Sequence, residues 1–234
     1  MAVEIGETVG EVLVVYYSRF GVLKDLAEAI AEGVEREPGA TAHLLAVGDT
    51  PVDLPQPGED EQAVALRRAP LLNRLAAADA LVIGAPSYFG SMASPLKRFF
   101  EDCLTASNPP QHDRSRPWYA EALRDKVGAA FTASATPQGG NEQGLHSMLT
   151  LMMHLGMLVV TPGQAAPILI NDAAPYGATA IAGAEGRRLA QPPALAAARD
   201  LGQRVARVAG WLKRGRTAWE QQGRDVVRPP RHAP

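Results

Sequence analysis

The sequence predicts an α/β fold of the doubly wound class, in which helices cover both faces of a five-stranded parallel sheet. Short apolar runs alternate five times along the chain with segments of helical periodicity. The runs are apolar throughout rather than at every second residue, which is typical of parallel strands buried on both faces. With 46% hydrophobic residues, the 234-residue chain can bury a full core.

The first strand is expected over residues 12–16, which form a continuous apolar run. The period then changes, because the next apolar residues recur at i, i+3, i+4 and i+7 and so share one face of a helix. These residues are Leu23, Leu26, Ala27 and Ile30. The helix is expected to end near Pro38 and Gly39.

The same alternation predicts the remaining elements. Four further strands are expected over residues 42–47, 80–84, 127–133 and 157–161. The accompanying helices are expected over residues 61–78, 95–104, 142–155 and 194–213. Pro70 is expected to break the first of these helices or to begin a second piece. Residues 162–193 show no clear period and are interpreted as a long functional loop.

Composition narrows the class of protein. Residues 1–213 are expected to form one domain, and the basic, proline-containing residues 214–234 are expected to form a mobile tail. A net charge of −2 and a pI of about 6.2 give no sign of a nucleic-acid partner. Cys103 is the only cysteine, which rules out an internal disulfide and fits a reducing compartment.

Other signals are also absent from the sequence. The acidic N-terminus lacks the layout of a signal peptide, and the apolar residues 148–160 are too few to span a bilayer. We therefore expect a cytoplasmic protein without stable membrane insertion. The five histidines are scattered, without H-E-x-x-H or a cysteine pair, so no metal site is expected. No G-x-S-x-G elbow supports a hydrolase.

Three loops follow the first, third and fourth expected strands: SRFGVL (residues 18–23), PSYFGS (86–91) and TASATPQGGNE (132–142). Right-handed crossovers bring such loops together at the carboxyl edge of the sheet, where ligands bind. Each loop mixes hydroxyl groups with glycine, and the first opens a helix. The N-terminus of a helix attracts a phosphate. Without a P-loop lysine, a monoester phosphate fits this loop better than a triphosphate with magnesium.

Three further residues allow two interpretations at this stage. Tyr88 and Phe89 would offer a flat ring an aromatic surface, although aromatic residues more often fill cores or turns. His154 lies among methionines and leucines, where a lone histidine is more often a satisfied core residue.

Four segments carry longer motifs: VLVVYYSRFG, ALVIGAPSYFGSMASPLKRFFED, GGNEQGLHSMLTLMMHLGMLVV and APYGATAIAGAEGRRLAQPPALAAARDLGQRVA. In this order they resemble the WrbA family of flavodoxin-like NAD(P)H:quinone oxidoreductases. The first family motif is V-L-V-x-Y-Y-S-x-Y-G-H. The last, P-Y-G-A-T-x-I-x-G-x-D-G-S-R, is the most specific, because simple flavodoxins lack it. The resemblance covers about residues 12–212 and implies strand order 2-1-3-4-5.

The resemblance implies a binding site for FMN. The residues that it assigns to the cofactor are Ser18, Arg19, Phe20, Gly21, Val22, Leu23, Pro86, Ser87, Tyr88, Phe89, Gly90, Ala133, Ser134, Ala135, Thr136, Gly139 and His154. It implies that His154 is catalytic, and that Phe20 and Trp118 contact the substrates. Val22, Tyr88 and Leu155 depart from the family, which has a polar residue, arginine and histidine there.

The resemblance also implies the reaction. NADH or NADPH would pass a hydride to flavin N5, and a quinone would then take two electrons in ping-pong order. The resemblance further implies a homotetramer in which each site is completed by neighbouring subunits. Two alternatives stay open: a flavodoxin-like electron carrier, and a regulatory or interaction protein with weak FMN binding. The near-neutral charge and the PYGAT segment count against the first, whereas Val22 and Leu155 favour the second.

Overall fold

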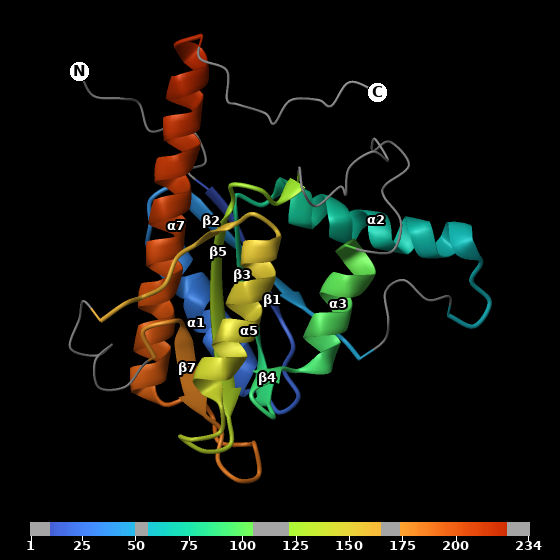
Figure 1. The fold of residues 1–234 in the computed structure, drawn as a ribbon, viewed down its shortest axis with the longest axis vertical. Helices are drawn as coiled ribbons and strands as arrows, with labels where there is room; N and C mark the ends of the chain where they lie inside the picture. Colours follow the sequence, from blue (N-terminus) through green and yellow to red (C-terminus); the bar gives the residue numbers. More distant parts are fainter. Residues whose placement is uncertain (1–9, 50–55, 105–121, 165–173, 224–234) are drawn as a thin grey trace.

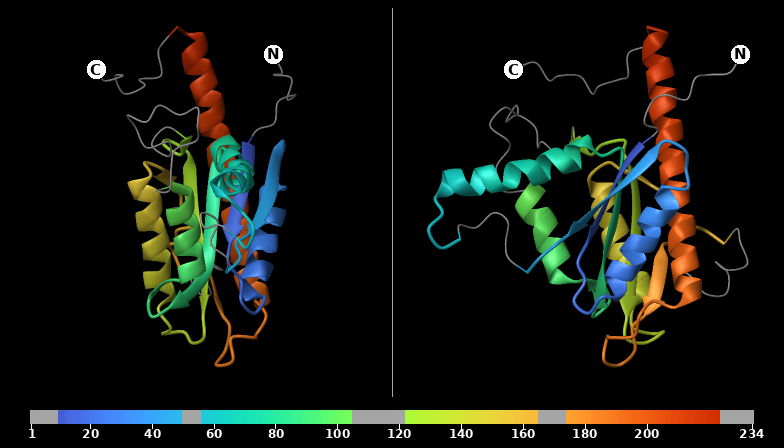
Figure 2. Two further views of the ribbon diagram at one scale, coloured as in Figure 1. Left: turned by 90° about the vertical axis from the view of Figure 1, so that its right-hand side faces the viewer. Right: turned by 180° about the vertical axis from the view of Figure 1, so that it is seen from behind.

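The computed structural model describes residues 10–49, 56–104, 122–164 and 174–223, and shows a central sheet between two layers of helices (Figures 1 and 2). The parallel strands are β1 (Gly10–Tyr16), β2 (Ala40–Ala46), β3 (Ala80–Tyr88), β5 (Val127–Ser134), β6 (Leu158–Val159) and β7 (Ala178–Ile181). They lie in the order β2-β1-β3-β5-β6, with β7 also paired to β5. The predicted order 2-1-3-4-5 therefore holds for the five expected strands.

The last expected strand differs from its prediction. Instead of one strand over residues 157–161, β6 pairs only with Val127 and Gly128 at the start of β5. The far half of β5 pairs with β7, which lies inside the segment expected to be a loop. Pro162 explains why β6 stops, because a proline has no N–H to donate to the ladder. β7 then pairs with the part of β5 that β6 leaves unpaired.

The helices divide between the two faces as the alternation of β1 side chains requires. Val12 and Val14 face α1 (Val22–Val34) and α7 (Pro192–Gln221). Leu13 and Val15 face α2 (Glu61–Ala77), α3 (Ser94–Leu104) and α5 (Asn141–His154). Both strand faces are buried, which confirms that the continuous apolar run marks a two-sided strand.

Two helices differ from their expected bounds. α2 is continuous through Pro70, which is exposed on the solvent side, where water can satisfy the carbonyl that loses its partner. α7 continues to Gln221 rather than ending at residue 213, so its last turns project past the sheet (Figure 1). Within the described ranges, no helix combines the length and hydrophobicity that crossing a bilayer requires.

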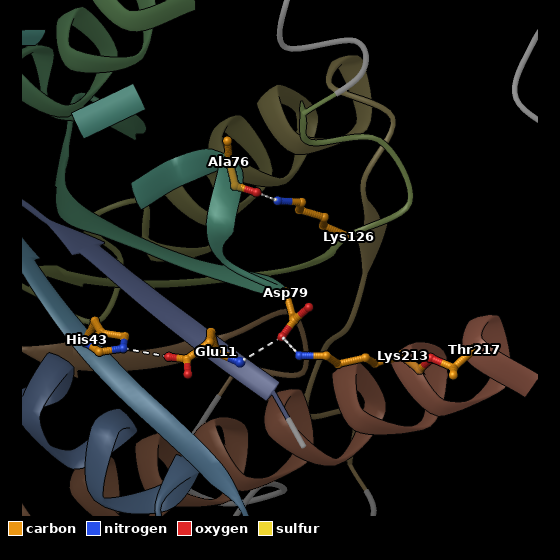
Figure 3. Close-up of polar contacts among 7 residues, drawn as sticks. All are labelled: Glu11, His43, Ala76, Asp79, Lys126, Lys213 and Thr217. Atoms are coloured by element: carbon orange, nitrogen blue, oxygen red, sulfur yellow. Dashed lines mark hydrogen bonds and ion pairs between the residues drawn. The ribbon is translucent and has the colours of Figure 1, made fainter. Parts of the chain in front are cut away.

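Polar contacts fasten the projecting part of α7 to the amino edge of the sheet (Figure 3). Asp79, at the start of β3, accepts hydrogen bonds from the Glu11 backbone and from Lys213 Nζ, both at 2.9 Å. Nearby, the Lys126 ammonium donates to the carbonyls of Leu75 and Ala76 at the end of α2. Burial lowers the pKa of Lys126 to about 8, against the opposing attraction of Asp79.

Helices α1 and α7 contact each other closely through glycines. A Cβ on Gly202 would lie 2.1 Å from the carbonyl oxygen of Ile30, and one on Gly33 would lie 2.0 Å from that of Arg199. Neither position tolerates a side chain, because backbone atoms cannot move aside as side chains can. The two backbones therefore touch, and α7 fixes α1 against the sheet.

Replacing Gly202 by alanine tests this contact. We expect Gly202→Ala to destabilise the protein by about 1–3 kcal/mol, because overpacking forces the two helices apart. The matched control is Gly215→Ala on the same helix, where nothing lies within 4 Å of the new methyl group. This control is expected to stabilise the helix by up to about 1 kcal/mol. Urea unfolding at fixed protein concentration measures the free energy of unfolding of both variants. Equal stability of Gly202→Ala and the wild type would contradict the contact.

Candidate functional site

A cavity of about 210 Å³ opens at the carboxyl edge of the sheet, between the loops that follow β1, β3, β5 and β7. It brings together ten of the predicted site residues: Arg19, Phe20, Val22, Leu23, Pro86, Ser87, Tyr88, Ala133, Ser134 and Ala135. Four lining residues were not predicted, namely Ala182, Ala184, Glu185 and Gly186. These four follow β7 and lie in the segment that carries the PYGAT motif, which was expected to be a loop but was not assigned to the cofactor.

The first loop presents the N-terminus of α1. Gly21 precedes the helix with φ of 105°, a conformation that side chains rarely adopt. Ser18 Oγ accepts hydrogen bonds from the N–H groups of Gly21 and Lys24, at 3.2 and 3.3 Å. Among the described residues, no hydrogen bond uses the N–H of Val22 or Leu23. These free donors and the helix dipole make the turn a site for an anion.

The second loop is a hairpin, which corrects the expected irregular loop. β3 continues to Tyr88 and turns back into β4 (Ser91–Met92). Phe89 and Gly90 form the turn with φ of 52° and 75°, the two positive values of a type I′ turn. The Phe89 side chain is fully exposed, so it does not fill the core. The hairpin therefore brings Tyr88 to the cavity and leaves Phe89 and Gly90, which were also predicted to contact the cofactor, outside its lining.

The third loop is held by its own hydrogen bonds. Ser134 Oγ donates to the carbonyl of Thr136 at 2.7 Å, and Gly139 N–H donates to the same oxygen at 2.9 Å. The Ser87 hydroxyl donates to the carbonyl of Gly140 at 2.7 Å and so ties this loop to β3. Thr136 and Gly139 shape the turn, while the cavity itself is lined by the residues before it.

The structure does not bring every predicted residue to this cavity. His154 is exposed at the last position of α5, whose first residue, Asn141, follows the third loop. At 1.5 Å per residue, this helix separates the two ends by about 20 Å. Trp118 lies outside the described residues.

The cavity offers few groups for acid–base or nucleophilic chemistry. Its described lining contains no cysteine, histidine or lysine. Tyr17, at the end of β1, has a raised pKa because it is buried and hydrogen-bonded to Asp49. Across the described residues, no three His, Cys, Asp or Glu side chains form a group that could hold a metal ion.

A family model described as NADPH-dependent FMN reductase matches residues 17–167, which is more than half of the chain. The matched region contains the loops after β1, β3 and β5. The chain belongs to the NADPH-dependent FMN reductase family.

Individual relatives of the chain agree with that result. A Geobacter sulfurreducens protein named NAD(P)H dehydrogenase (quinone) is 37% identical over 210 residues, 86% of this chain and 98% of that protein. A Gluconacetobacter diazotrophicus protein of the same name is 38% identical over 210 residues, with the same shares. The crystal structure of a WrbA-like flavodoxin from Agrobacterium tumefaciens has 30% identity and a TM-score of 0.55, covering 86% of this chain and 97% of that chain. The resemblance to the WrbA family and the flavodoxin-like fold are therefore confirmed.

The residues at the FMN reductase site fit the cofactor that the family name implies. The free N–H groups of Val22 and Leu23 suit a monoester phosphate. The space in front of Gly21 is open, because nothing lies within 4 Å of where its Cβ would be. Beside this turn, alanines and Pro86 give apolar walls of the kind that a flat ring needs.

Replacing Gly21 by alanine tests the phosphate turn. We expect Gly21→Ala to weaken FMN binding about 5- to 30-fold, because a left-handed alanine costs about 1–2 kcal/mol and displaces the N–H groups that follow. Titration of the FMN-free protein, followed by quenching of flavin fluorescence, gives the affinity. Gly58→Ala is the control, since Gly58 has φ of 88° in open space before α2. It should carry similar strain and leave FMN affinity unchanged; an equal loss in both variants would contradict a local role for Gly21.

Proposed function

We propose that this protein is an FMN-dependent oxidoreductase that oxidises NADH or NADPH and reduces a quinone. The observation that carries the proposal is the single cavity shared by the free N-terminus of α1 and the walls from β3, β5 and the segment after β7. Relatives named NAD(P)H dehydrogenase (quinone) support the same reaction. When bound, FMN supplies the redox chemistry by taking a hydride at N5 and passing two electrons to a quinone.

The protein's own residues would bind FMN, orient it and shield it from water. The N–H groups of Val22 and Leu23 would hold the phosphate of bound FMN, and the Ser18 hydroxyl would donate its hydrogen to the same phosphate. The apolar walls of Pro86 and Ala133 would exclude water from a ring bound in the cavity. Tyr88 lines the cavity and is 39% exposed, so it marks a side open to solvent, where donor and acceptor would take turns. One shared slot for two substrates gives ping-pong kinetics.

The proposal includes a homotetramer in which neighbours complete each site. A ligand pocket usually measures about 300–1,000 Å³, so the cavity of one chain encloses only part of the cofactor. His154 is exposed and lies about a helix length from the cavity of its own chain. Its catalytic role is therefore possible only toward the flavin of a neighbouring subunit, where its N–H would donate to a flavin carbonyl oxygen.

The reaction is tested with the purified protein loaded with FMN. We expect a flavin absorbance spectrum, NAD(P)H oxidation that depends on a benzoquinone acceptor, and parallel double-reciprocal lines. A flavin-loaded protein without quinone-dependent oxidation would identify an electron carrier instead. A protein that takes up no FMN would identify a regulatory or interaction protein. Intersecting lines would contradict the shared slot.

His154 is tested by mixing variants. We expect His154→Ala to slow flavin reduction by about 10²-fold or more, as loss of a preorganised donor does. Co-assembly of His154→Ala with Gly21→Ala should recover part of the rate, because one chain then supplies the flavin and its neighbour the imidazole. His43→Ala, an exposed histidine on β2, is the control and should leave the rate unchanged. No recovery on mixing would contradict action across subunits.

A further inference from the structure

Two guanidinium groups surround an exposed aromatic ring at the rim of the cavity. The Cζ atoms of Arg19 and Arg187 lie 5.4 and 5.2 Å from the centroid of the Phe20 ring. The ring is 42% exposed, although aromatic side chains of this size are usually buried. The segment after β7 packs closely on it, because a Cβ on Gly186 would lie 2.9 Å from Phe20 Cδ2. The two loops therefore assemble one cationic, aromatic surface.

The charge of this surface is not neutralised by the described residues. Their ion pairs involve neither Arg19 nor Arg187. Glu185 lines the same cavity and also forms none of these pairs. Two arginines against one carboxylate leave a positive excess, held near the ring by cation–π contacts. Guanidinium groups without a carboxylate partner bind phosphate in a bidentate manner.

We propose that Arg19, Phe20 and Arg187 bind the 2′-phosphoadenosine end of NADPH, so that the protein prefers NADPH to NADH. This inference rests on the proposed function, which left the choice of donor open. A flat base stacks on an aromatic ring or a guanidinium plane, while the phosphate pairs with a guanidinium. An arginine near the ribose is also the usual means of accepting a 2′-phosphate.

The alternative source of phosphate is FMN itself, but its phosphate already has donors. The N–H groups of Val22 and Leu23 at the start of α1 suit that group without either arginine. The arginine at 187 also departs from the family motif, in which G-x-D-G-S-R places serine there. Arg19 occupies a position that the family motif leaves variable. The two arginines thus stand at positions where the motif does not specify arginine.

The neighbouring Arg188 provides a matched control. It lines a separate cavity of about 820 Å³ on the other side of the third loop, together with Gln138, Gln191 and Thr179. Its backbone N–H donates to Ala182 at 2.8 Å, and this bond remains when the side chain is changed. Arg187→Ser and Arg188→Ser therefore remove the same charge from adjacent residues, but only Arg187 contacts the Phe20 ring, whereas Arg188 lines the other cavity.

Steady-state kinetics of the FMN-loaded protein provide the first test. We expect Arg187→Ser to raise KM for NADPH about 10- to 100-fold, the range for a lost charge-assisted hydrogen bond, with kcat unchanged. In both Arg187→Ser and Arg188→Ser, KM for NADH and the Kd of FMN should stay within about twofold of the wild type. Arg187→Lys should restore part of the affinity for NADPH that Arg187→Ser loses. Equal effects on NADH and NADPH, or an effect of Arg188→Ser as large as that of Arg187→Ser, would overturn the proposal. Weaker FMN binding in Arg187→Ser alone would assign the arginine to the flavin phosphate instead.

Calorimetry provides a second test that needs no turnover. We expect wild-type protein to bind adenosine 2′,5′-bisphosphate at least 10-fold more tightly than adenosine 5′-monophosphate, and Arg187→Ser to lose this difference. Added salt should weaken binding of the bisphosphate more than binding of the monophosphate. Equal affinities in the wild type would overturn the inference. If the protein binds the bisphosphate but reduces no quinone, the proposed function fails while the nucleotide site stands.

Discussion

The backbone contact between α1 and α7 determines where both walls of the cavity lie. Gly33 and Gly202 let the two helices touch, so α1 cannot slide or rotate against the sheet without displacing α7. The first turn of α1 carries the anion site. The segment just before α7 carries the opposite wall, and its Ala190 N–H donates to Asp25 of α1 at 3.3 Å. One helix pair thus positions the phosphate turn and the surface around Phe20 relative to each other.

Ion pairs add little to this helix pair. Arg199 pairs with Glu32 at 2.6 Å and Arg207 with Glu37 at 3.2 Å, but these pairs lie on the surface and contribute about 0–1 kcal/mol each. Close packing across the glycines carries more of the stability, because it buries apolar surface on both helices. At the amino edge, Asp79 and Lys213 hold the far end of α7. The helix is therefore fixed at both ends of the sheet, which suits a rigid cofactor site.

Much of the fold could be predicted because its signal is local. Each buried strand is a continuous apolar run, and such runs locate β1, β3 and β5 within a few residues. β7 escaped prediction because its four residues become a strand only where β5 leaves an edge unpaired. Pro70 does not interrupt α2, because water can satisfy the carbonyl that loses its partner on the exposed face of the helix. Such outcomes depend on tertiary partners that no short window of sequence contains.

The candidate site also has parts that the sequence predicts and parts that it does not. Three walls were predictable, because parallel strands bring their carboxyl ends together. The fourth wall, at Ala182 and Gly186, depends on the long-range pairing of β7 and was missed. The prediction for His154 differs from the structure for another reason. Residues at opposite ends of one 14-residue helix cannot both reach one small cavity. The length of this helix can be estimated from the sequence, and it predicts that His154 and the loop before α5 serve different sites.

Val22 shows how a departure from the family motif is accommodated. Its side chain is buried in the core beneath the turn, so a polar group there would lose water as well as gain a phosphate contact. The phosphate donors come instead from backbone N–H groups, which any residue at this position supplies. The departure therefore removes one side-chain hydrogen bond and leaves the helix dipole and the free amides intact. Charge at the rim is added separately by Arg19 and Arg187, so cofactor binding and donor choice are set by different residues of adjoining loops.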